Sequence, residues 1–182
     1  MAKLLLHTCC GPCSTVPVPA LREEGFDVMG YFYNPNIHPY TEYKKRLEAL
    51  QDYARQQDLQ IIGAADYDPV EYFHHVTFRE QKRCQLCYQL RLHQTARIAR
   101  SGKFDYFSTT LLVSPFQKHD QIKEAGEIAA QKYGVPFLYR DFRDQYKETV
   151  SRSKEAGLYR QQYCGCLYSE QERYTSHRTK RY

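Results

Sequence analysis

The sequence predicts a single domain of the α/β class, and three observations lead to this prediction. Five short apolar runs of strand length alternate with longer segments whose apolar residues recur at helical spacing. Turn residues, chiefly Gly and Pro, separate the two kinds of segment. The chain has 182 residues, which suits one domain, and it contains neither an internal repeat nor a linker. Because crossover helices must cover both faces of a parallel sheet, we expect a doubly wound, Rossmann-like sheet of about five strands.

The first expected strand and the turn after it hold the densest chemistry in the chain. The strand is an apolar run at 3–7, and Gly11 and Pro12 then turn the chain into a helix expected at 14–24, which Gly25 ends. This turn contains three thiols, those of Cys9, Cys10 and Cys13. Ligands bind at the carboxyl edge of an open α/β sheet, especially where the strand order reverses. The start of a helix also favours a thiolate over a thiol.

The remaining elements follow from the same two patterns. Short apolar runs predict further strands at 28–33, 59–65, 104–111 and 135–139. Amphipathic spacing predicts helices at 40–57, from 68 onward, and at 84–100, 117–133 and 145–157. Two prolines keep 34–39 in a loop. The domain is expected to span 1–174, with a basic and disordered tail at 175–182.

Composition limits the functions that suit this chain. It has no run of about 18 apolar residues and no charged start followed by an apolar stretch, which predicts a soluble, cytoplasmic protein without a membrane segment. The net charge of +5 is only moderately basic, and an excess of this size is usually a solvated surface. Seventeen Tyr with no Trp, several of them beside Arg, would suit base stacking with phosphate contact. Tyr at half-buried edges is the alternative.

Seven cysteines need a separate explanation. An odd number argues against a disulfide framework, and clustered thiols in a reducing compartment favour metal binding or redox chemistry. They form three groups, Cys9 with Cys10 and Cys13, Cys84 with Cys87, and Cys164 with Cys166.

The Cys84-Gln85-Leu86-Cys87 motif opens a predicted helix, so both sulfurs can face one ion or cluster. Cys10 and Cys13 would supply a second pair, which leaves structural zinc open. However, the gap of 70 residues between Cys13 and Cys84 far exceeds the roughly 15–20 residues of a zinc ribbon. The adjacent pair Cys9-Cys10 fits a 4Fe-4S cluster better, because four thiolates around it tolerate a wider spread of directions.

Two further interpretations concern the other cysteine spacings. Cys10-Gly11-Pro12-Cys13 is also the motif of the thioredoxin active site, which keeps a dithiol oxidoreductase open although that fold mixes antiparallel strands. Cys164 and Cys166 can close only a tight, strained disulfide that is easily reduced and stores two electrons. The alternative for this pair is a second metal, bound together with Asp141.

Six motifs occur in order along the chain, LLHTCCGPCS at 5–14, FYNPNIHP at 32–39, CQLCY at 84–88, FSTTLLVSP at 107–115, YRDFR at 139–143 and YRQQYCGC at 159–166. They extend over nearly the whole chain, about residues 3–174, and resemble those of the QueH family of epoxyqueuosine reductases. The resemblance implies the last step in making queuosine, the modified nucleoside at the wobble position of certain tRNAs. In that step the epoxide oxygen of epoxyqueuosine is removed by a two-electron reduction.

The resemblance also implies roles for six cysteines. Cys9, Cys10, Cys84 and Cys87 would hold a 4Fe-4S cluster, and Cys164 with Cys166 would form a redox-active disulfide. Cys13 keeps no assigned role, and a second iron or other metal ion stays open. The implied partners are tRNA and an electron donor protein or reductant. The reaction also needs an acid for the departing oxygen, and His7, His38, Asp141 and the Tyr residues are candidates.

Contact with tRNA is expected at basic and aromatic residues near the predicted edge. Arg140, Arg143, Arg160 and Lys118 would contact phosphates, and Tyr33 or Tyr163 would stack on a splayed base. Two other functions stay open on the residues alone. One is an ATP-dependent tRNA-modifying enzyme of the PP-loop kind, although cysteines replace its Gly-rich phosphate cradle. The other is a metal-stabilised RNA-binding module.

Overall fold

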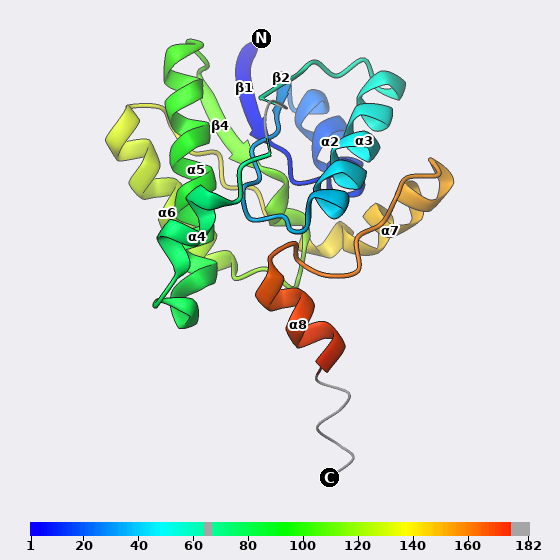
Figure 1. Ribbon diagram of the computed structural model, residues 1–182. Helices are drawn as coiled ribbons and strands as arrows, with labels where there is room; N and C mark the ends of the chain where they lie inside the picture. The colour runs from blue at the N-terminus through cyan, green and yellow to red at the C-terminus, as the bar shows by residue number, and fades with distance from the viewer. Residues whose placement is uncertain (64–66, 176–182) are drawn as a thin grey trace.

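A computed structural model describes residues 1–63 and 67–175, and its centre is a parallel sheet (Figure 1). The four strands of this sheet are β1 (Ala2–His7), β2 (Phe26–Tyr31), β3 (Ile61–Ile62) and β4 (Tyr106–Thr109), in the order β3-β2-β1-β4. His7 at the end of β1 lies opposite Tyr31 of β2 and Thr109 of β4. The chain therefore runs outward from β1 to β3 and then returns to the other side of β1, where the strand order reverses.

Helices cover both faces of the sheet, which confirms the doubly wound α/β prediction (Figure 1). They are α1 (Gly11–Ser14), α2 (Pro17–Glu23), α3 (Tyr40–Gln56), α4 (Val70–Val76), α5 (Arg83–Ser101), α6 (His119–Tyr133), α7 (Tyr146–Glu155) and α8 (Leu167–Thr175). Short 3-10 helices occur at Glu80–Lys82, Thr110–Val113 and Arg143–Gln145. In Figure 1, α2 and α3 lie on one side of the sheet and α5 and α6 on the other. Among the described residues, no helix is both long enough and apolar enough to cross a membrane.

The core lies on both faces of the central strand. Leu4, Leu5 and Leu6 of β1 are fully buried, although successive side chains of a strand point to opposite faces. Val18 from α2 and Leu92 from α5 belong to the same buried cluster. A strand covered on both faces by helices needs apolar side chains at every position, which is why β1 reads as one continuous apolar run.

The prediction of a fifth strand at 135–139 was wrong. This segment runs beside β4, where the Phe107 N–H donates to the Pro136 carbonyl (3.1 Å) and the Leu138 N–H donates to the Phe107 carbonyl (2.8 Å). One isolated bridge joins Phe107 to Phe137. Pro136 has no N–H to donate, so the ladder does not extend further. The sheet accordingly has four strands in the described part of the chain.

Three other predicted elements are shorter than expected or divided. The strand predicted at 104–111 is limited to Tyr106–Thr109, and a 3-10 helix follows it directly. The strand predicted at 59–65 is limited to Ile61–Ile62, because Gly63 adopts φ +85°, which leaves extended backbone; its predicted end lies outside the described residues. The helix predicted at 14–24 is divided into α1, which begins at Gly11, and α2. Pro17 and Pro19 have no N–H, so a continuous helix would lack two of its hydrogen bonds.

The C-terminal end differs from the prediction in one helix. No helix is predicted at the position of α8, which ends at Thr175. The predicted domain end at 174 falls inside this helix, and the rest of the predicted tail, 176–182, lies outside the described residues.

Candidate functional site

Polar contacts join the carboxyl ends of β1, β2 and β4 at one edge of the sheet. His7 Nδ1 lies 2.9 Å from the Thr109 hydroxyl, and Nε2 lies 3.1 Å from the Tyr33 carbonyl. The Asn34 amide donates to the Thr8 carbonyl at 2.9 Å. A carbonyl only accepts, so Nε2 carries the ring proton, and burial lowers the pKa of His7 to about 4. His7 is therefore a neutral link between strands.

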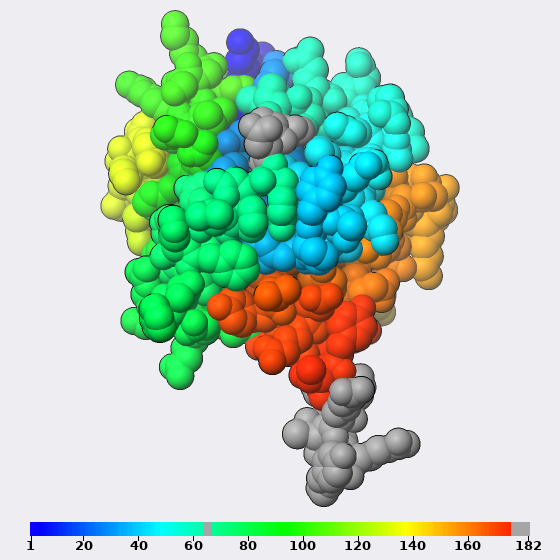
Figure 2. Space-filling view, viewed as in Figure 1, coloured from blue at the N-terminus to red at the C-terminus, as the bar shows by residue number. Residues whose placement is uncertain are grey.

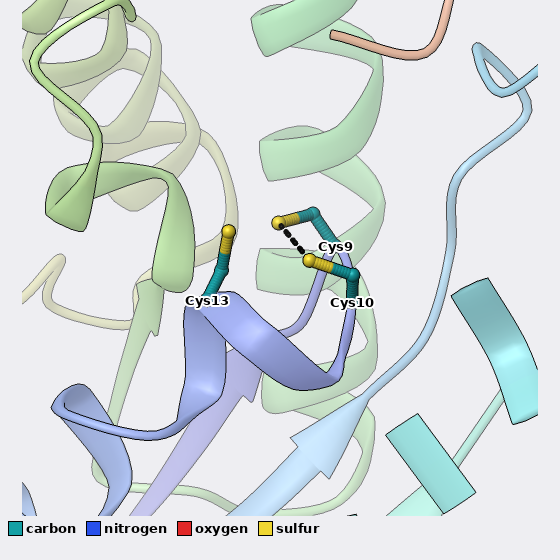
Figure 3. A group of neighbouring side chains, drawn as sticks. All are labelled: Cys9, Cys10 and Cys13. Atoms are coloured by element: carbon teal, nitrogen blue, oxygen red, sulfur yellow. Dashed lines mark hydrogen bonds between the residues drawn. The ribbon is translucent and has the colours of Figure 1, made fainter. Parts of the chain in front are cut away.

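Directly after β1, Cys9, Cys10 and Cys13 form a buried group, here called the three-thiol group (Figure 3). Their sulfurs all lie within 4.8 Å of one another, and those of Cys9 and Cys10 are 3.7 Å apart. Gly11 is needed for this arrangement, because a Cβ there would lie 2.4 Å from the carbonyl oxygen of Ala49 in α3. The tight packing of α1 on α3 thus brings Cys13 back toward the other two sulfurs.

Side chains from distant segments contact the three-thiol group. The Thr110 hydroxyl donates to Cys9 Sγ at 3.5 Å. Gln161 donates from Nε2 to Cys13 Sγ at 3.5 Å, and its Oε1 lies 3.4 Å from Cys10 Sγ. Hydrogen bonds with Cys10 and Cys13 lower the pKa of Cys9 well below its usual range, whereas hydrogen bonds with Cys10 and Cys9 raise the pKa of Cys13. The group thus favours one thiolate, stabilised by two thiols. Because α1 has only four residues, its dipole adds little to the predicted effect.

A second thiol group lies at the start of α5 and consists of the neighbouring cysteines Cys84, Cys87, Cys164 and Cys166. Cys87 belongs to a buried cluster that also contains Tyr72 of α4 and Cys166. Burial raises the pKa of Cys87 to about 12, and the neighbouring thiols of Cys84, Cys164 and Cys166 act in the same direction. The predicted CxxC and CxC motifs, far apart in the sequence, therefore lie close together in the fold.

Buried ionic contacts hold the segment 164–166 in place. The fully buried guanidinium of Arg46 donates to the carbonyl oxygens of Tyr163 and Cys164, each at 2.8 Å. It also forms an ion pair with Glu42 at 2.7 Å. Figure 2 shows the orange and red C-terminal segment lying against the blue and cyan residues that lead into α3 and against the green α4 region. The position of the CxC motif is thus fixed by α3.

The two cysteines of this motif have different surroundings. Cys164 is exposed, and the amide of Gln117 donates to its Sγ at 3.6 Å. Cys166 is buried, and the backbone N–H of Ser169 donates to its Sγ at 3.4 Å. Both are free thiols in this structure, so their disulfide stays a prediction.

The predicted cluster ligands divide between the two thiol groups. Within the described residues, the metal-ligating side chains gathered within 4.8 Å of one another are those of Cys9, Cys10 and Cys13, so Cys84 and Cys87 lie outside that group. Arg91 in α5 connects the groups, because the thiols of Cys9 and Cys87 both act electrostatically on its guanidinium. The four-cysteine set therefore stays a prediction, and Cys13 is an additional sulfur at this edge.

Two of the predicted proton donors are held in states without an available acidic proton. His38 is buried, its Nε2 donates to the Pro35 carbonyl at 2.9 Å, and burial lowers its pKa. Asp141 accepts from Arg143 Nε at 2.9 Å, and this pairing lowers the pKa of the carboxyl to about 2. Asp141 Oδ1 also lies 3.9 Å from His119 Nδ1. Asp141 is therefore an anion at neutral pH, the form that binds metals rather than donates protons.

Three of the residues predicted to contact tRNA have polar partners within the fold. Arg140 pairs with Glu24 at 2.9 Å. Tyr33 donates to Glu71 at 2.5 Å, and Tyr163 donates to the His38 carbonyl at 2.5 Å. Because these hydroxyls are engaged and the rings are partly buried, stacking would use only their exposed faces.

Four side chains at the site are not among the predicted site residues: Arg46, Gln117, Gln161 and Thr110. Arg46 reads as one of many charges on an amphipathic helix, and its burial follows from a contact with residues more than a hundred positions away. Gln161 lies in the motif that carries Cys164 and Cys166, and this nearness was the available signal, whereas Thr110 lies in the cysteine-free motif at 107–115.

Known proteins resemble this chain in sequence over nearly its whole length. The family model described as "Epoxyqueuosine reductase QueH" matches residues 4–172. The chain belongs to the QueH family of epoxyqueuosine reductases. A relative of that name from Dehalococcoides mccartyi is 42% identical over 172 residues, which cover 94% of each chain. Another, from Thermotoga maritima, is 37% identical and covers 97% of this chain and 95% of its own. The protein is therefore an oxidoreductase that acts on tRNA in queuosine biosynthesis.

Two solved structures share the fold at low sequence identity. The U34-tRNA thiolase NcsA from Methanococcus maripaludis, described with its [4Fe-4S] cluster, has a TM-score of 0.59 and 15% identity, covering 94% of this chain and 64% of its own. A predicted tRNA methyltransferase subunit from Methanocaldococcus jannaschii has a TM-score of 0.57 and 12% identity, covering 85% of this chain and 75% of its own. These likenesses support the Rossmann-like α/β fold of this family member.

Proposed function

We propose that this epoxyqueuosine reductase holds a 4Fe-4S cluster through Cys9, Cys10, Cys84 and Cys87. The donor set suits the group, since soft thiolates are the usual ligands of iron–sulfur clusters. A fully buried Arg91, whose Nη2 atom lacks a hydrogen-bond partner, contacts the backbone of Cys87, as a nearby negatively charged group would require. The NcsA structure, described with such a cluster on a similar fold, also supports the proposal. Cys13 stays without an assigned role in this proposal, and the alternative for Cys164, Cys166 and Asp141 is a second metal ion.

When bound, the cluster supplies electrons at low potential. The remaining chemistry belongs to the side chains of the chain. Cys164 and Cys166 as a dithiol would release two electrons and two protons on closing to a disulfide. Opening the epoxide to an alkene consumes the same two electrons and two protons, and the oxygen leaves as water. An external reductant, a dithiol or an electron donor protein, would then reopen the disulfide.

Protons would be held beside the CxC motif by Tyr72. Tyr72 and Cys166 belong to the same buried cluster, and the pKa of the Tyr72 phenol is raised, chiefly by burial and then by the nearby thiols. Tyr72 therefore stays protonated at neutral pH and can keep a proton at Cys166 Sγ. Asp141 remains a proposed site residue in its ionised form, which suits a metal ligand and not the acid.

The tRNA substrate would reach the exposed Cys164 from the surface. Arg143, Arg160 and Lys118 are proposed to contact its phosphates, which predicts affinity that falls with salt. Alanine substitutions at these positions should reduce both the affinity for tRNA and the slope of its salt dependence. Action on tRNA also supports a cytoplasmic location.

The observation that carries this proposal is the burial of Cys166 and Cys87 in one cluster, which joins the CxC and CxxC motifs. The test is a single-turnover assay, in which anaerobically reduced protein is freed of external reductant and mixed with tRNA that carries epoxyqueuosine. We expect about one product per chain, together with loss of two free thiols. Cys166→Ser should form no product although its iron and sulfide content is unchanged. Product formation by Cys166→Ser at the wild-type level would contradict the role of the CxC pair.

A further inference from the structure

Arg91, near the middle of α5, is a buried charge without a carboxylate partner. Its side chain is 2% exposed. Nε donates to the Cys87 carbonyl at 3.3 Å, while Nη2 has no hydrogen-bond partner. Throughout the described ranges 1–63 and 67–175, no Asp or Glu forms an ion pair with it. An unpaired charge in a protein interior is strongly unfavourable, so this arginine is expected to meet an anion that the polypeptide alone does not supply.

Arg91 is unusual when its polar partners are compared with those of Arg46. It is buried to the same degree, with 1% exposed, yet it pairs with Glu42 and donates to two carbonyl oxygens. The fold thus compensates one buried guanidinium completely and leaves the other with a single long hydrogen bond and a stacking contact. That contact is with the ring of Tyr88, whose centroid lies 5.8 Å from the guanidinium carbon of Arg91.

The ionisable groups that interact with Arg91 indicate where the missing anion lies. The thiols of Cys87, Cys164 and Cys9 and the phenol of Tyr88 act on its charge. These thiols come from both thiol groups, so the positive charge of Arg91 acts on both. Cys87 lies four residues before Arg91, which places both side chains on one face of α5.

We propose that Arg91 is a positioning residue that acts by charge: its guanidinium balances the negative charge of the thiolate-bound iron–sulfur centre and favours both its retention and its reduction. This rests on the cluster in the proposed function. Four thiolates around a 4Fe-4S core carry net negative charge, and reduction adds one electron more. A fixed cation in a site of low dielectric stabilises that added charge strongly.

The first test measures the stability of the metal-free protein. Because an unpaired buried charge is unfavourable, Arg91→Met should unfold at the same urea concentration as the wild type or a higher one. Arg46→Met should unfold at a clearly lower concentration, because it leaves Glu42 and two carbonyl groups without their partner. A loss in Arg91→Met as large as that in Arg46→Met would overturn the proposal, since Arg91 would then be a structural residue.

The second test uses protein reconstituted anaerobically with iron and sulfide. The midpoint potential is followed by EPR during a redox titration of Arg91→Met, Arg91→Lys and the exposed control Arg97→Met. We expect Arg91→Met to lower the ratio of reduced to oxidised cluster at least tenfold at a given potential, a shift of about 59 mV to more negative values. Arg91→Lys should restore most of the shift. Equal potentials in Arg91→Met and Arg97→Met would overturn the proposal.

These measurements separate the two hypotheses. If the wild-type protein takes up neither iron nor sulfide, the proposed cluster fails, and the metal-free test still decides the role of Arg91. Stability of Arg91→Met at or above that of the wild type would then support a charge held ready for a bound anion. A clear loss of stability would refute it.

Discussion

Replacing Arg46 by Met is expected to release the segment that carries Cys164 and Cys166. The guanidinium is buried and makes three contacts, with Glu42 at 2.7 Å and with the carbonyl oxygens of Tyr163 and Cys164 at 2.8 Å each. Met has a similar volume, so the substitution removes the charge and the donors with little change in packing. The free energy of unfolding should fall because three acceptors lose their partner in a dry environment.

The size of this loss follows from the contacts. Removing one partner of a buried ion pair costs about 3–5 kcal/mol, because the other charge is left uncompensated. Glu42 keeps one donor, the Tyr159 hydroxyl at 2.6 Å, which places the expected loss near the lower end of that range. A loss of about 3 kcal/mol is a large share of the roughly 5–15 kcal/mol that stabilises most domains.

Urea unfolding of the metal-free protein measures this loss, and a double-mutant cycle with Glu42→Gln isolates the pair. The double variant should be more stable than the sum of the two single losses predicts, because neither partner is then left charged and alone. Limited proteolysis should also cut Arg46→Met near 164–166 faster than the wild type. A loss below about 1 kcal/mol, with additive single effects, would refute the idea that this buried pair anchors the CxC motif.

Three further predictions concern other parts of the molecule. Gly11→Ala should lower the free energy of unfolding by about 1–3 kcal/mol, measured in urea, because the new Cβ would lie 2.4 Å from the Ala49 carbonyl oxygen; unchanged stability would contradict the close packing of α1 on α3. Burial raises the pKa of Tyr53 to about 12, so stability present below pH 10 is lost as the pH rises to 12, by roughly 2–3 kcal/mol. Tyr53→Phe should lose less stability than the wild type between pH 10 and pH 12. An equal loss in the two proteins would contradict this prediction. Arg143→Gln should raise the pKa of Asp141 from about 2 toward its ordinary value of 3.8, as followed by NMR of the carboxyl carbon; no change would mean that the ion pair does not form in solution.

Local sequence signals were enough to predict the class of the fold and the edge where the site lies. The leucines of β1 and the turn at Gly11 and Pro12 are recognisable from a few neighbouring residues. The strand and the position of Cys9 after it could therefore be predicted from the sequence. The fifth strand was predicted although Pro136 lies inside the apolar run, and a proline there is itself a sequence signal against a regular strand.

The site itself depends on contacts between distant segments, which one sequence does not contain. Spacing alone could group the cysteines into three motifs, but not place Cys166 beside Cys87 or Cys13 beside Cys9. The burial of Arg46 is equally invisible, since charged residues on an amphipathic helix normally face water. Its role appears only once the C-terminal segment packs on α3.

The iron and sulfide content of anaerobically reconstituted variants, measured together with EPR of the reduced protein, decides whether Cys84 and Cys87 hold the cluster. We expect about four irons and four sulfides per chain in the wild type and in Cys13→Ala, and loss of both in the double variant Cys84→Ala, Cys87→Ala. A double variant that keeps its cluster while Cys13→Ala loses it would show that the three-thiol group alone holds the metal, and would contradict the proposed ligand set.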